Sequence, residues 1–291
     1  MKHAILGAGA IGGLVGVALA SIGERVDVIV RPEKLTSYPE NLSLQRPSAT
    51  LTGRAKIIAS LKDAVDVLWI ATKTYQLEAA LENVKSAPRR VIPLLNGVDH
   101  IAVLRARFGN DSVVPGTIAV EAESIAPGQF VQRSPFVRLN LAASGKPLLS
   151  GIIEQLSHLA FTCKFIENEQ TLLWSKLCFL APFALLTSAS GLNVGEILAD
   201  TSWKQKLYSA VDEACAVANA SGAKIDPSPM RESFSAVLPT MRSSMQKDLV
   251  AGRRLELDAI GGPIVRGGKE YDIPVSTTAE LMTAIGAKAK L

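Results

Sequence analysis

Lys176 lies in an apolar run where an ammonium group has few polar neighbours. It is the single charged side chain in "TLLWSKLCFLAPFALLTSASG", residues 171–191. Burial lowers the pKa of a lysine because it disfavours the charged form. A lysine of this kind can hydrogen-bond a ketone oxygen and deliver a proton as a hydride reaches the carbon. The alternative is that its methylenes cover apolar neighbours while its charge stays in water.

A carboxylate that would support Lys176 occurs later, in "SSMQKDLVAGRRLELD". Ser244 and Asp248 are four residues apart and share one face of a predicted helix. Glu256 comes eight residues after Asp248, on the following helix. A nearby carboxylate holds and orients a charged lysine, so Glu256 is the candidate partner of Lys176. A purely structural ion pair is the alternative.

A dinucleotide-binding turn is predicted near the N-terminus. Its residues are Gly7, Ala8, Gly9, Ala10, Ile11 and Gly12, which fit G-x-G-x-x-G. They follow a predicted strand and open a predicted helix, as the mechanism requires. The first glycine permits the turn, the second lets the backbone approach a pyrophosphate, and the third lets helix and strand pack closely. A turn kept only for packing is the alternative.

The end of the second strand indicates which dinucleotide is bound. NAD-binding proteins place an acidic residue there, whereas this chain has Arg31, with Lys34 nearby. The planar guanidinium group suits the 2′-phosphate of NADP. Asp27 is the competing candidate for the NAD ribose, but it lies within the strand. The sequence therefore favours NADP, and an ordinary solvated Arg31 is the alternative.

Polar side chains follow two further strands, in "ATKT" and "LNG". Lys73 would meet a phosphate or a substrate carboxylate, and Asn96 would orient the substrate or the nicotinamide. Both positions lie beyond the carboxyl ends of strands, where open α/β sheets bind ligands. Each is equally compatible with a cap or turn residue.

The first half of the chain predicts an α/β domain. Its expected elements are strands at 3–6, 25–30, 66–71, 91–95 and 163–166 and helices at 14–22, 75–84 and 148–159. Such alternation predicts a parallel sheet with helices on both faces. The β-type runs of residues 113–142 predict that this sheet ends in antiparallel strands.

The second half of the chain predicts helices alone. They are expected at residues 170–188, 203–220, 230–250, 255–266 and 276–289. We place the boundary so that residues 1–167 form the dinucleotide-binding domain and residues 168–291 the helical domain.

Composition excludes several functional classes. The chain has 291 residues, of which 48% are hydrophobic and 20% charged, with a net charge of +4. Scattered basic residues do not predict a nucleic-acid partner. Cys163, Cys178 and Cys215 show neither disulfide nor zinc spacing, which fits a reducing cytoplasm and predicts no metal. The apolar run around Lys176 is short and interrupted by Pro182, so we expect a buried helix and no membrane span.

The chain resembles the ketopantoate reductase (2-dehydropantoate 2-reductase) family over essentially its whole length. The matching segments are "ILGAGAIGG", "ATKTYQ", "LLNGV", "WSKL" and "SSMQKDLVAGRRLELDAIGG". The resemblance implies a Rossmann domain followed by an all-helical domain like the C-terminal domain of 6-phosphogluconate dehydrogenase, with the active site in the cleft between them. It also implies hydride transfer from NADPH to ketopantoate, giving pantoate for pantothenate and coenzyme A. A homodimer is an expectation of the same resemblance.

The resemblance assigns roles to individual residues. Lys176 matches the general acid, Glu256 the glutamate that supports it, and Ser244 the serine that holds the substrate carboxylate. Further matches are Asn96 near both ligands, Lys73 after its strand, Arg31 at the NADP phosphate, and Asn193, which lies one position from a third family asparagine.

The sequence departs from the family where the substrate is recognised. The family usually has asparagines four and eight residues after the lysine, and this chain has Leu180 and Ala184 there. The leading hypothesis is therefore an NADPH-dependent 2-keto acid reductase, with ketopantoate as its substrate. One alternative is a reductase for a more apolar 2-keto acid, and another is an NADPH-binding protein without turnover.

Overall fold

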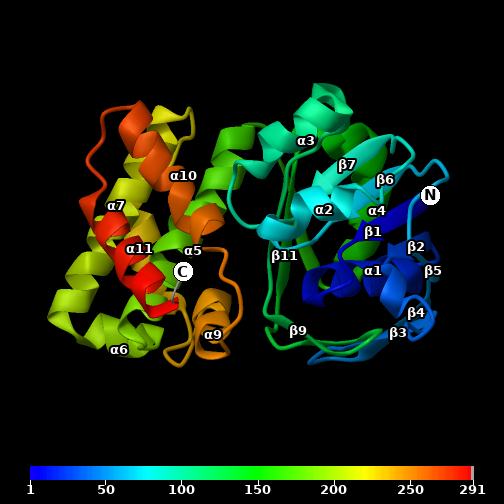
Figure 1. Cartoon of the computed structure of the whole chain (residues 1–291), viewed down its shortest axis with the longest axis horizontal. Helices are drawn as coiled ribbons and strands as arrows, with labels where there is room; N and C mark the ends of the chain where they lie inside the picture. Colours follow the sequence, from blue (N-terminus) through cyan, green and yellow to red (C-terminus); the bar gives the residue numbers. More distant parts are fainter. Residues whose placement is uncertain (290–291) are drawn as a thin grey trace. The chain divides into compact units, whose positions relative to one another are not determined.

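The computed structural model describes residues 1–289 and divides by its contacts into two compact units. The first contains Met1–Leu95 and His100–Glu167, and the second contains Asn96–Asp99 and the chain from Asn168 onward. Figure 1 shows the first unit in blue to green and the helices of the second in green to red. The short segment Asn96–Asp99 thus belongs to the second unit, although the chain before and after it belongs to the first.

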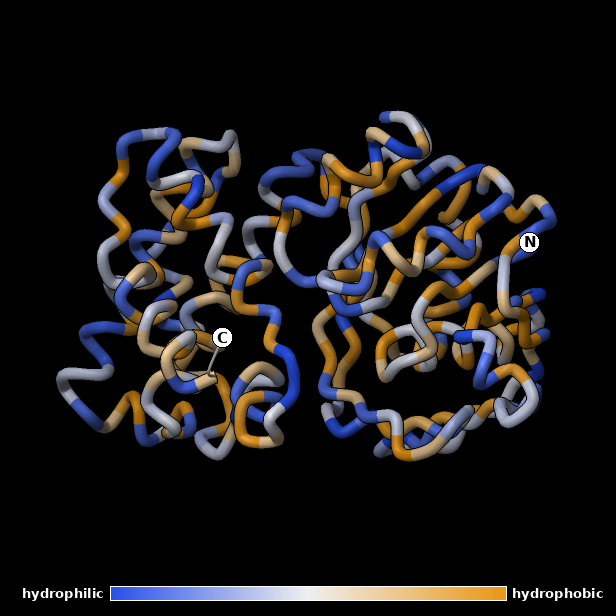
Figure 2. The backbone as a smooth tube through the Cα atoms, viewed as in Figure 1, coloured by the Kyte–Doolittle hydropathy of each residue, from blue (hydrophilic) through white to orange (hydrophobic). Residues whose placement is uncertain are grey.

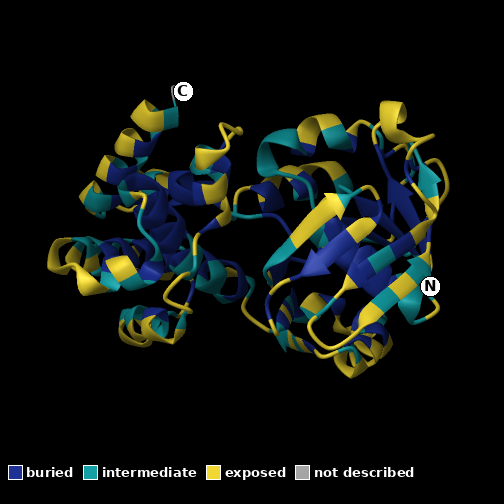
Figure 3. Cartoon of the chain, turned by 90° about the horizontal axis from the view of Figure 1, so that it is seen from below, coloured by how far each residue is buried: buried dark blue, intermediate teal, exposed yellow. Residues whose placement is uncertain are grey.

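A parallel sheet organises the first unit. Its strands are β1 (Lys2–Leu6), β2 (Arg25–Ile29), β5 (Lys56–Ile58), β6 (Val67–Ile70) and β7 (Arg90–Pro93), in the order β5-β2-β1-β6-β7. Each neighbouring pair is parallel. The strands are apolar and mostly buried, as expected where both faces of a sheet are covered (Figures 2 and 3).

Helices and a second sheet cover this parallel sheet. Helix α1 (Ala10–Ser21) joins β1 to β2 and also packs on a sheet in the order β4-β3-β10-β9. The opposite face carries the 3-10 turn η2 (Thr74–Gln76) and helix α2 (Leu77–Leu81), whose leucines share a core with strands β1 and β6. The unit also contains the helices α3 (His100–Phe108) and α4 (Lys146–His158).

The antiparallel strands do not extend the parallel sheet, contrary to the sequence-based expectation. The second sheet contains β3 (Asn41–Gln45), β4 (Thr50–Arg54), β9 (Ala122–Ala126) and β10 (Gln129–Gln132), and a further sheet contains β8 (Gly116–Ala119), β11 (Val137–Ala142) and β12 (Phe161–Ile166). Phe130 of β10 explains part of this arrangement. Its ring is buried over Gly13 of α1, where an added Cβ would lie 2.1 Å from the ring. The second sheet therefore covers α1.

Within the described residues, the chain from Asn168 onward forms helices and loops. The helices are α5 (Glu169–Ser190), α6 (Val194–Ala199), α7 (Thr201–Ala220), α8 (Pro227–Ser233), α9 (Ser244–Val250), α10 (Leu257–Glu270) and α11 (Ser276–Ala289). The expected helix at 230–250 is wrong, because α8 ends before Pro239, whose missing N–H disfavours a continuing helix. The expected class, a Rossmann-type α/β domain followed by a helical domain, is confirmed.

Helix α5 is the central helix of the second unit. The Asn168 side chain accepts a hydrogen bond from the Thr171 amide at its start, and Gly191 ends it with φ 82°. By length and composition alone α5 could cross a membrane, a test that the core helix of a soluble protein also passes. Most of α5 is buried among the other helices of the unit, so its apolar character is that of a core helix.

Candidate active site

The three glycines of the N-terminal turn meet different steric demands. Gly7 has φ 102°, and an added Cβ would lie 2.8 Å from the Ala71 carbonyl carbon. A Cβ on Gly12 would lie 2.0 Å from the Gly7 carbonyl oxygen, so only glycine lets α1 begin here. An added Cβ on Gly9 would have no other atom of the described residues within 4 Å. Gly9 is exposed, so its backbone is accessible from outside the protein.

The turn also presents polar groups suited to an anion. Gly9 is the N-cap of α1, and the first N–H groups of a helix attract phosphate oxygens. Thr72, which follows β6, lies beside Gly7, and its Oγ1 is buried with no hydrogen-bond partner among the described residues. Buried hydroxyls are normally bonded, so Thr72 is a candidate cofactor contact that the sequence pattern did not single out.

The structure separates the two candidates for the ribose end of the cofactor. Asp27 is buried within β2, and its Oδ2 lies 3.4 Å from Lys2 Nζ. Arg31 is exposed just beyond β2, where the 3-10 turn η1 (Pro32–Lys34) begins. A paired, buried carboxylate is poorly placed to bind a ribose, whereas an exposed guanidinium group is accessible to phosphate. This geometry favours Arg31.

Lys73 lies beyond the end of β6, as the sequence predicted. It is half-buried and is the N-cap residue of η2. Its extended backbone (φ −64°, ψ 143°) follows Thr72 and precedes the turn. The lysine therefore sits on the loop that packs against Gly7, on the strand-end side of the parallel sheet.

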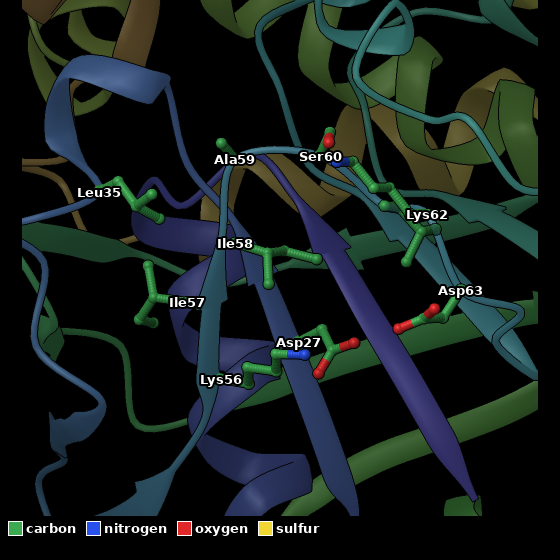
Figure 4. A pocket seen from close by; sticks show the side chains of 10 residues that line it. Asp27, Leu35, Lys56, Ile57, Ile58, Ala59, Ser60, Lys62 and Asp63 are labelled. Atoms are coloured by element: carbon green, nitrogen blue, oxygen red, sulfur yellow. The ribbon is translucent and has the colours of Figure 1, made fainter.

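A cavity of about 370 Å³ lies elsewhere on the first unit. It is lined by strand β5 and the following residues, with Asp27 and Leu35. Figure 4 shows Leu35 and Ile57 on one side and Lys62 and Asp63 on the other. These lining residues do not include the glycine turn, Arg31 or Lys73. This cavity is therefore not part of the candidate cofactor site.

In the second unit, Lys176, Asn96 and Glu256 form a hydrogen-bonded chain. Lys176 Nζ donates to Asn96 Oδ1 at 3.1 Å, and Asn96 Nδ2 donates to Glu256 Oε2 at 3.2 Å. Glu256 is buried at the N-cap of α10, and Lys176 is half-buried on α5. The sequence predicted all three residues as functional, but it did not predict that the amide would stand between the two charges.

Burial lowers the pKa of Lys176 to about 8, and the negative charge of Glu256 opposes part of that lowering. A lysine with a pKa near 8 is protonated at neutral pH and gives up its proton more easily than an exposed lysine. An effective general acid has a pKa near the working pH. Lys176 therefore has the protonation properties that its predicted role requires.

The segment Asn96–Asp99 is fixed to α10 and the helical core. Gly97 has φ 80°, and an added Cβ would lie 2.2 Å from the Ala259 carbonyl oxygen. Val98 packs against the helical core, and Asp99 Oδ2 lies 2.5 Å from Arg266 Nη2. These contacts explain how Asn96, which follows a strand of the first unit, joins Lys176 and Glu256.

Two further predicted residues lie at helix starts. Ser244 is the first residue of α9 and is exposed. Asp248, one turn later, is buried and pairs with Arg253, at 2.8 Å from its Nε. Asn193 forms a capping box with Glu196 at the start of α6, which accounts for its side-chain oxygen locally. A substrate contact for Ser244 or Asn193 stays a prediction.

The residues that depart from the family pattern lie on α5. Leu180 is one helical turn beyond Lys176 and is partly buried, while Ala184, a further turn along, is buried. Spacings of four residues place these side chains near one face of the helix. The first two side chains beyond Lys176 on this face are therefore apolar, and that of Ala184 lies in the helical core.

Comparison with known proteins identifies a single family across both units. The model described as "Ketopantoate reductase PanE/ApbA" matches residues 3–144, and "Ketopantoate reductase PanE/ApbA C terminal" matches residues 168–289. A 2-dehydropantoate 2-reductase of Caulobacter vibrioides is 28% identical, and the match covers 98% of each chain.

Solved structures share the fold along the whole chain. A PanE/ApbA family ketopantoate reductase from Ralstonia eutropha has a TM-score of 0.86 at 23% identity, covering 100% of this chain and 99% of that one. D-mandelate dehydrogenase, solved with NADH and anilino(oxo)acetate, has a TM-score of 0.87 at 24% identity, covering 100% of this chain and 98% of that one.

Proposed function

Because the chain belongs to the ketopantoate reductase family, we propose that it reduces 2-dehydropantoate to pantoate with NADPH, a step in pantothenate and coenzyme A biosynthesis. Membership makes the chain an NADP-dependent oxidoreductase that acts on CH–OH groups and a keto-acid reductase of this type. The chain of hydrogen bonds from Lys176 through Asn96 to Glu256 is the observation that supports the proposal most directly.

The residues of the first unit bind the cofactor in this proposal. NADPH, when bound, supplies the hydride. The N–H groups of the glycine turn hold the pyrophosphate, and the open space beside Gly9 admits it. Arg31 binds the 2′-phosphate, and Lys73 adds positive charge near the phosphates. This binding mode needs no acidic residue at the end of β2, and Asp27 stays paired with Lys2.

The residues of the second unit handle the proton. The ammonium group of Lys176 donates a hydrogen bond to the keto oxygen and transfers its proton as the oxygen becomes an alkoxide. Asn96 holds the ammonium group by its oxygen, while Glu256 fixes the amide and favours the charged lysine. Ser244 binds the substrate carboxylate, and Asn193 contributes at the edge of the same site.

The proposal is tested by NADPH oxidation with purified protein and a panel of 2-keto acids. The panel contains 2-dehydropantoate, pyruvate, a branched aliphatic acid and phenylglyoxylate. Lys176→Ala should lower kcat by about 10²–10⁴-fold, as expected for the loss of a general acid, and leave the NADPH Kd nearly unchanged. Lys206→Ala is the control, because Lys206 is a half-buried lysine of α7 that pairs with Glu280. Equal losses of turnover and NADPH affinity would contradict the role of Lys176.

Leu180 and Ala184 favour a second candidate substrate, a more apolar 2-keto acid. Apolar side chains cannot hydrogen-bond the hydroxyl of 2-dehydropantoate, and an unpaired polar group in a site is costly. Phenylglyoxylate is in the panel because D-mandelate dehydrogenase has the same fold and mandelate is the corresponding alcohol. A higher kcat/KM for the branched or aryl acid would select this candidate, and NADPH binding without oxidation would support a non-catalytic protein.

The expected homodimer and cytoplasmic location are parts of the same proposal. Size-exclusion chromatography with light scattering tests the dimer. The fold is typical of soluble proteins, and fractionation of cells tests the location.

A further inference from the structure

Helix α9 carries Ser244 and is too short to hold its own position. It spans Ser244–Val250, seven residues, and helices of this length are unstable without tertiary contacts. Ser244 is exposed, whereas both of its neighbours, Ser243 and Met245, are buried. The direction of the Ser244 hydroxyl therefore depends on what anchors the residues beside it.

The anchor on α5 is a buried hydrogen bond between two hydroxyl groups. Thr187 Oγ1 and Ser243 Oγ lie 2.8 Å apart, and their residues are 0% and 1% exposed. Ser243 Oγ also accepts a hydrogen bond from the Gln246 amide at 3.0 Å, which caps α9. Thr187 Oγ1 donates to the Phe183 carbonyl oxygen at 2.8 Å. The proton of Ser243 is then the one that joins the two side chains.

A second contact fixes the same helix to the end of α5. Gln246 Nε2 donates to the Leu192 carbonyl oxygen at 3.1 Å, and Gln246 is 2% exposed. The contact involves the side chain of Gln246 and the turn after α5, so it limits the rotation of α9. The contact of Ser243 with Thr187 instead fixes the first turn, where Ser244 lies.

Thr187 shares a face of α5 with Lys176. The two residues are eleven positions apart, which is close to three full turns of about 3.6 residues. One stripe of α5 thus carries the candidate general acid at one end and the anchor of α9 at the other. No sequence pattern indicates a role for Thr187, because a threonine in an apolar helix shows its importance only through its partner.

We propose that Thr187 is a positioning residue for substrate binding, which holds Ser244 toward the substrate carboxylate through the hydroxyl of Ser243. The inference rests on the proposed function, because it takes Ser244 as the serine that binds that carboxylate. It names the contact that sets the position of Ser244. It also predicts a higher KM for the keto acid with the kcat and the pKa of Lys176 unchanged.

The test compares Thr187→Val, which removes the hydroxyl, with Thr187→Ser, which keeps it. The KM for the best 2-keto acid of the panel should rise about tenfold in Thr187→Val, the loss expected when a hydrogen bond to a charged group is misplaced. The kcat, the NADPH KM and the pH profile should stay near those of the unchanged protein. Thr187→Ser should restore the original KM.

A matched control and a double variant separate positioning from general damage. Thr283 of α11 is exposed and bonds its own helix, at 3.0 Å from the Ala279 carbonyl oxygen, so Thr283→Val should change nothing. Thr187→Val combined with Ser244→Ala should raise KM no further than Ser244→Ala alone, because residues that act through one contact are not additive. Additive effects of the two changes would overturn the proposal. An unchanged KM in Thr187→Val or in Ser244→Ala would do the same.

Hydrogen exchange tests the anchor without any turnover. The amides of α9 should exchange faster in Thr187→Val than in Thr283→Val or the unchanged protein. Unchanged exchange would overturn the proposal even if KM rises. If no 2-keto acid is reduced by the unchanged protein, the proposed function fails, and faster exchange still assigns Thr187 as the anchor of α9.

Discussion

Replacing Glu256 with glutamine should move the pH at which reduction slows. The proposed mechanism requires protonated Lys176, so kcat/KM for the keto acid should be constant at low pH and fall above a pH of about 8. The carboxylate of Glu256 raises the pKa of Lys176 against the larger lowering by burial. Glutamine removes that charge and keeps an oxygen that can accept from Asn96, so the fall should begin at lower pH.

The size of the shift follows from the two hydrogen bonds through Asn96. Contacts of 3.1 and 3.2 Å on either side of one amide separate the ammonium nitrogen from the carboxylate oxygen by no more than about 8.5 Å. At an effective dielectric constant of about 20, unit charges at that distance attract by about 2 kcal/mol. This equals about 1.4 pH units, and solvent beside the half-buried lysine reduces the expected shift to about 1 unit.

The assay is the pH dependence of kcat/KM at saturating NADPH, which reports the pKa of the enzyme before it binds the keto acid. Asp258→Asn is the matched control, because Asp258 lies two residues away, is exposed and pairs with Arg266. Its removal should leave the profile in place. A profile that still falls near pH 8 in Glu256→Gln, or that shifts equally in Asp258→Asn, would refute the electrostatic coupling of Glu256 to Lys176.

Three further changes test the cofactor and substrate assignments. Arg31→Ala should raise the KM for NADPH about ten- to hundredfold, the range for lost hydrogen bonds to a charged group; a similar rise for NADH would contradict a phosphate contact. Gly9→Ala should weaken NADPH binding with little change in the Tm of the free protein. Gly12→Ala should lower the Tm by many degrees, because its Cβ would lie 2.0 Å from the Gly7 carbonyl oxygen. Calorimetry with and without NADPH distinguishes the two effects. Leu180→Asn should raise kcat/KM for 2-dehydropantoate by about two- to tenfold relative to phenylglyoxylate, and an unchanged ratio would remove Leu180 from substrate selection.

Local features of the fold were predictable because their causes lie close together in the sequence. The strand at 3–6, the glycine turn and the helix that starts at Ala10 depend on one another within about twenty residues. Positive φ at Gly7 and the missing Cβ at Gly12 are requirements of that turn itself. The turn at Gly7 and the close packing at Gly12 were therefore readable from the glycine pattern, whereas a pyrophosphate contact at Gly9 stays a prediction.

Features that depend on distant contacts were not predictable from patterns. The strands of residues 113–142 lie in two further sheets, and one of these covers α1 with Phe130, a contact that no local pattern indicates. The position of Asn96 in the second unit depends on Gly97 meeting Ala259 and on Asp99 meeting Arg266. These contacts join residues more than 150 positions apart. The sequence around Asn96 therefore does not predict them.

The amide between Lys176 and Glu256 has a chemical advantage over direct contact of the two charges. Lysine can only donate and an ionised glutamate can only accept, so Asn96 must turn its oxygen to Lys176 and its nitrogen to Glu256. A carboxylate in direct contact would stabilise the ammonium group strongly and raise its pKa, which opposes proton transfer to the substrate. With the amide between them, burial is the larger influence, and the pKa of Lys176 is lowered to about 8. In the proposed mechanism, Asn96 therefore lets Glu256 orient the lysine while the lysine stays acidic enough to donate its proton.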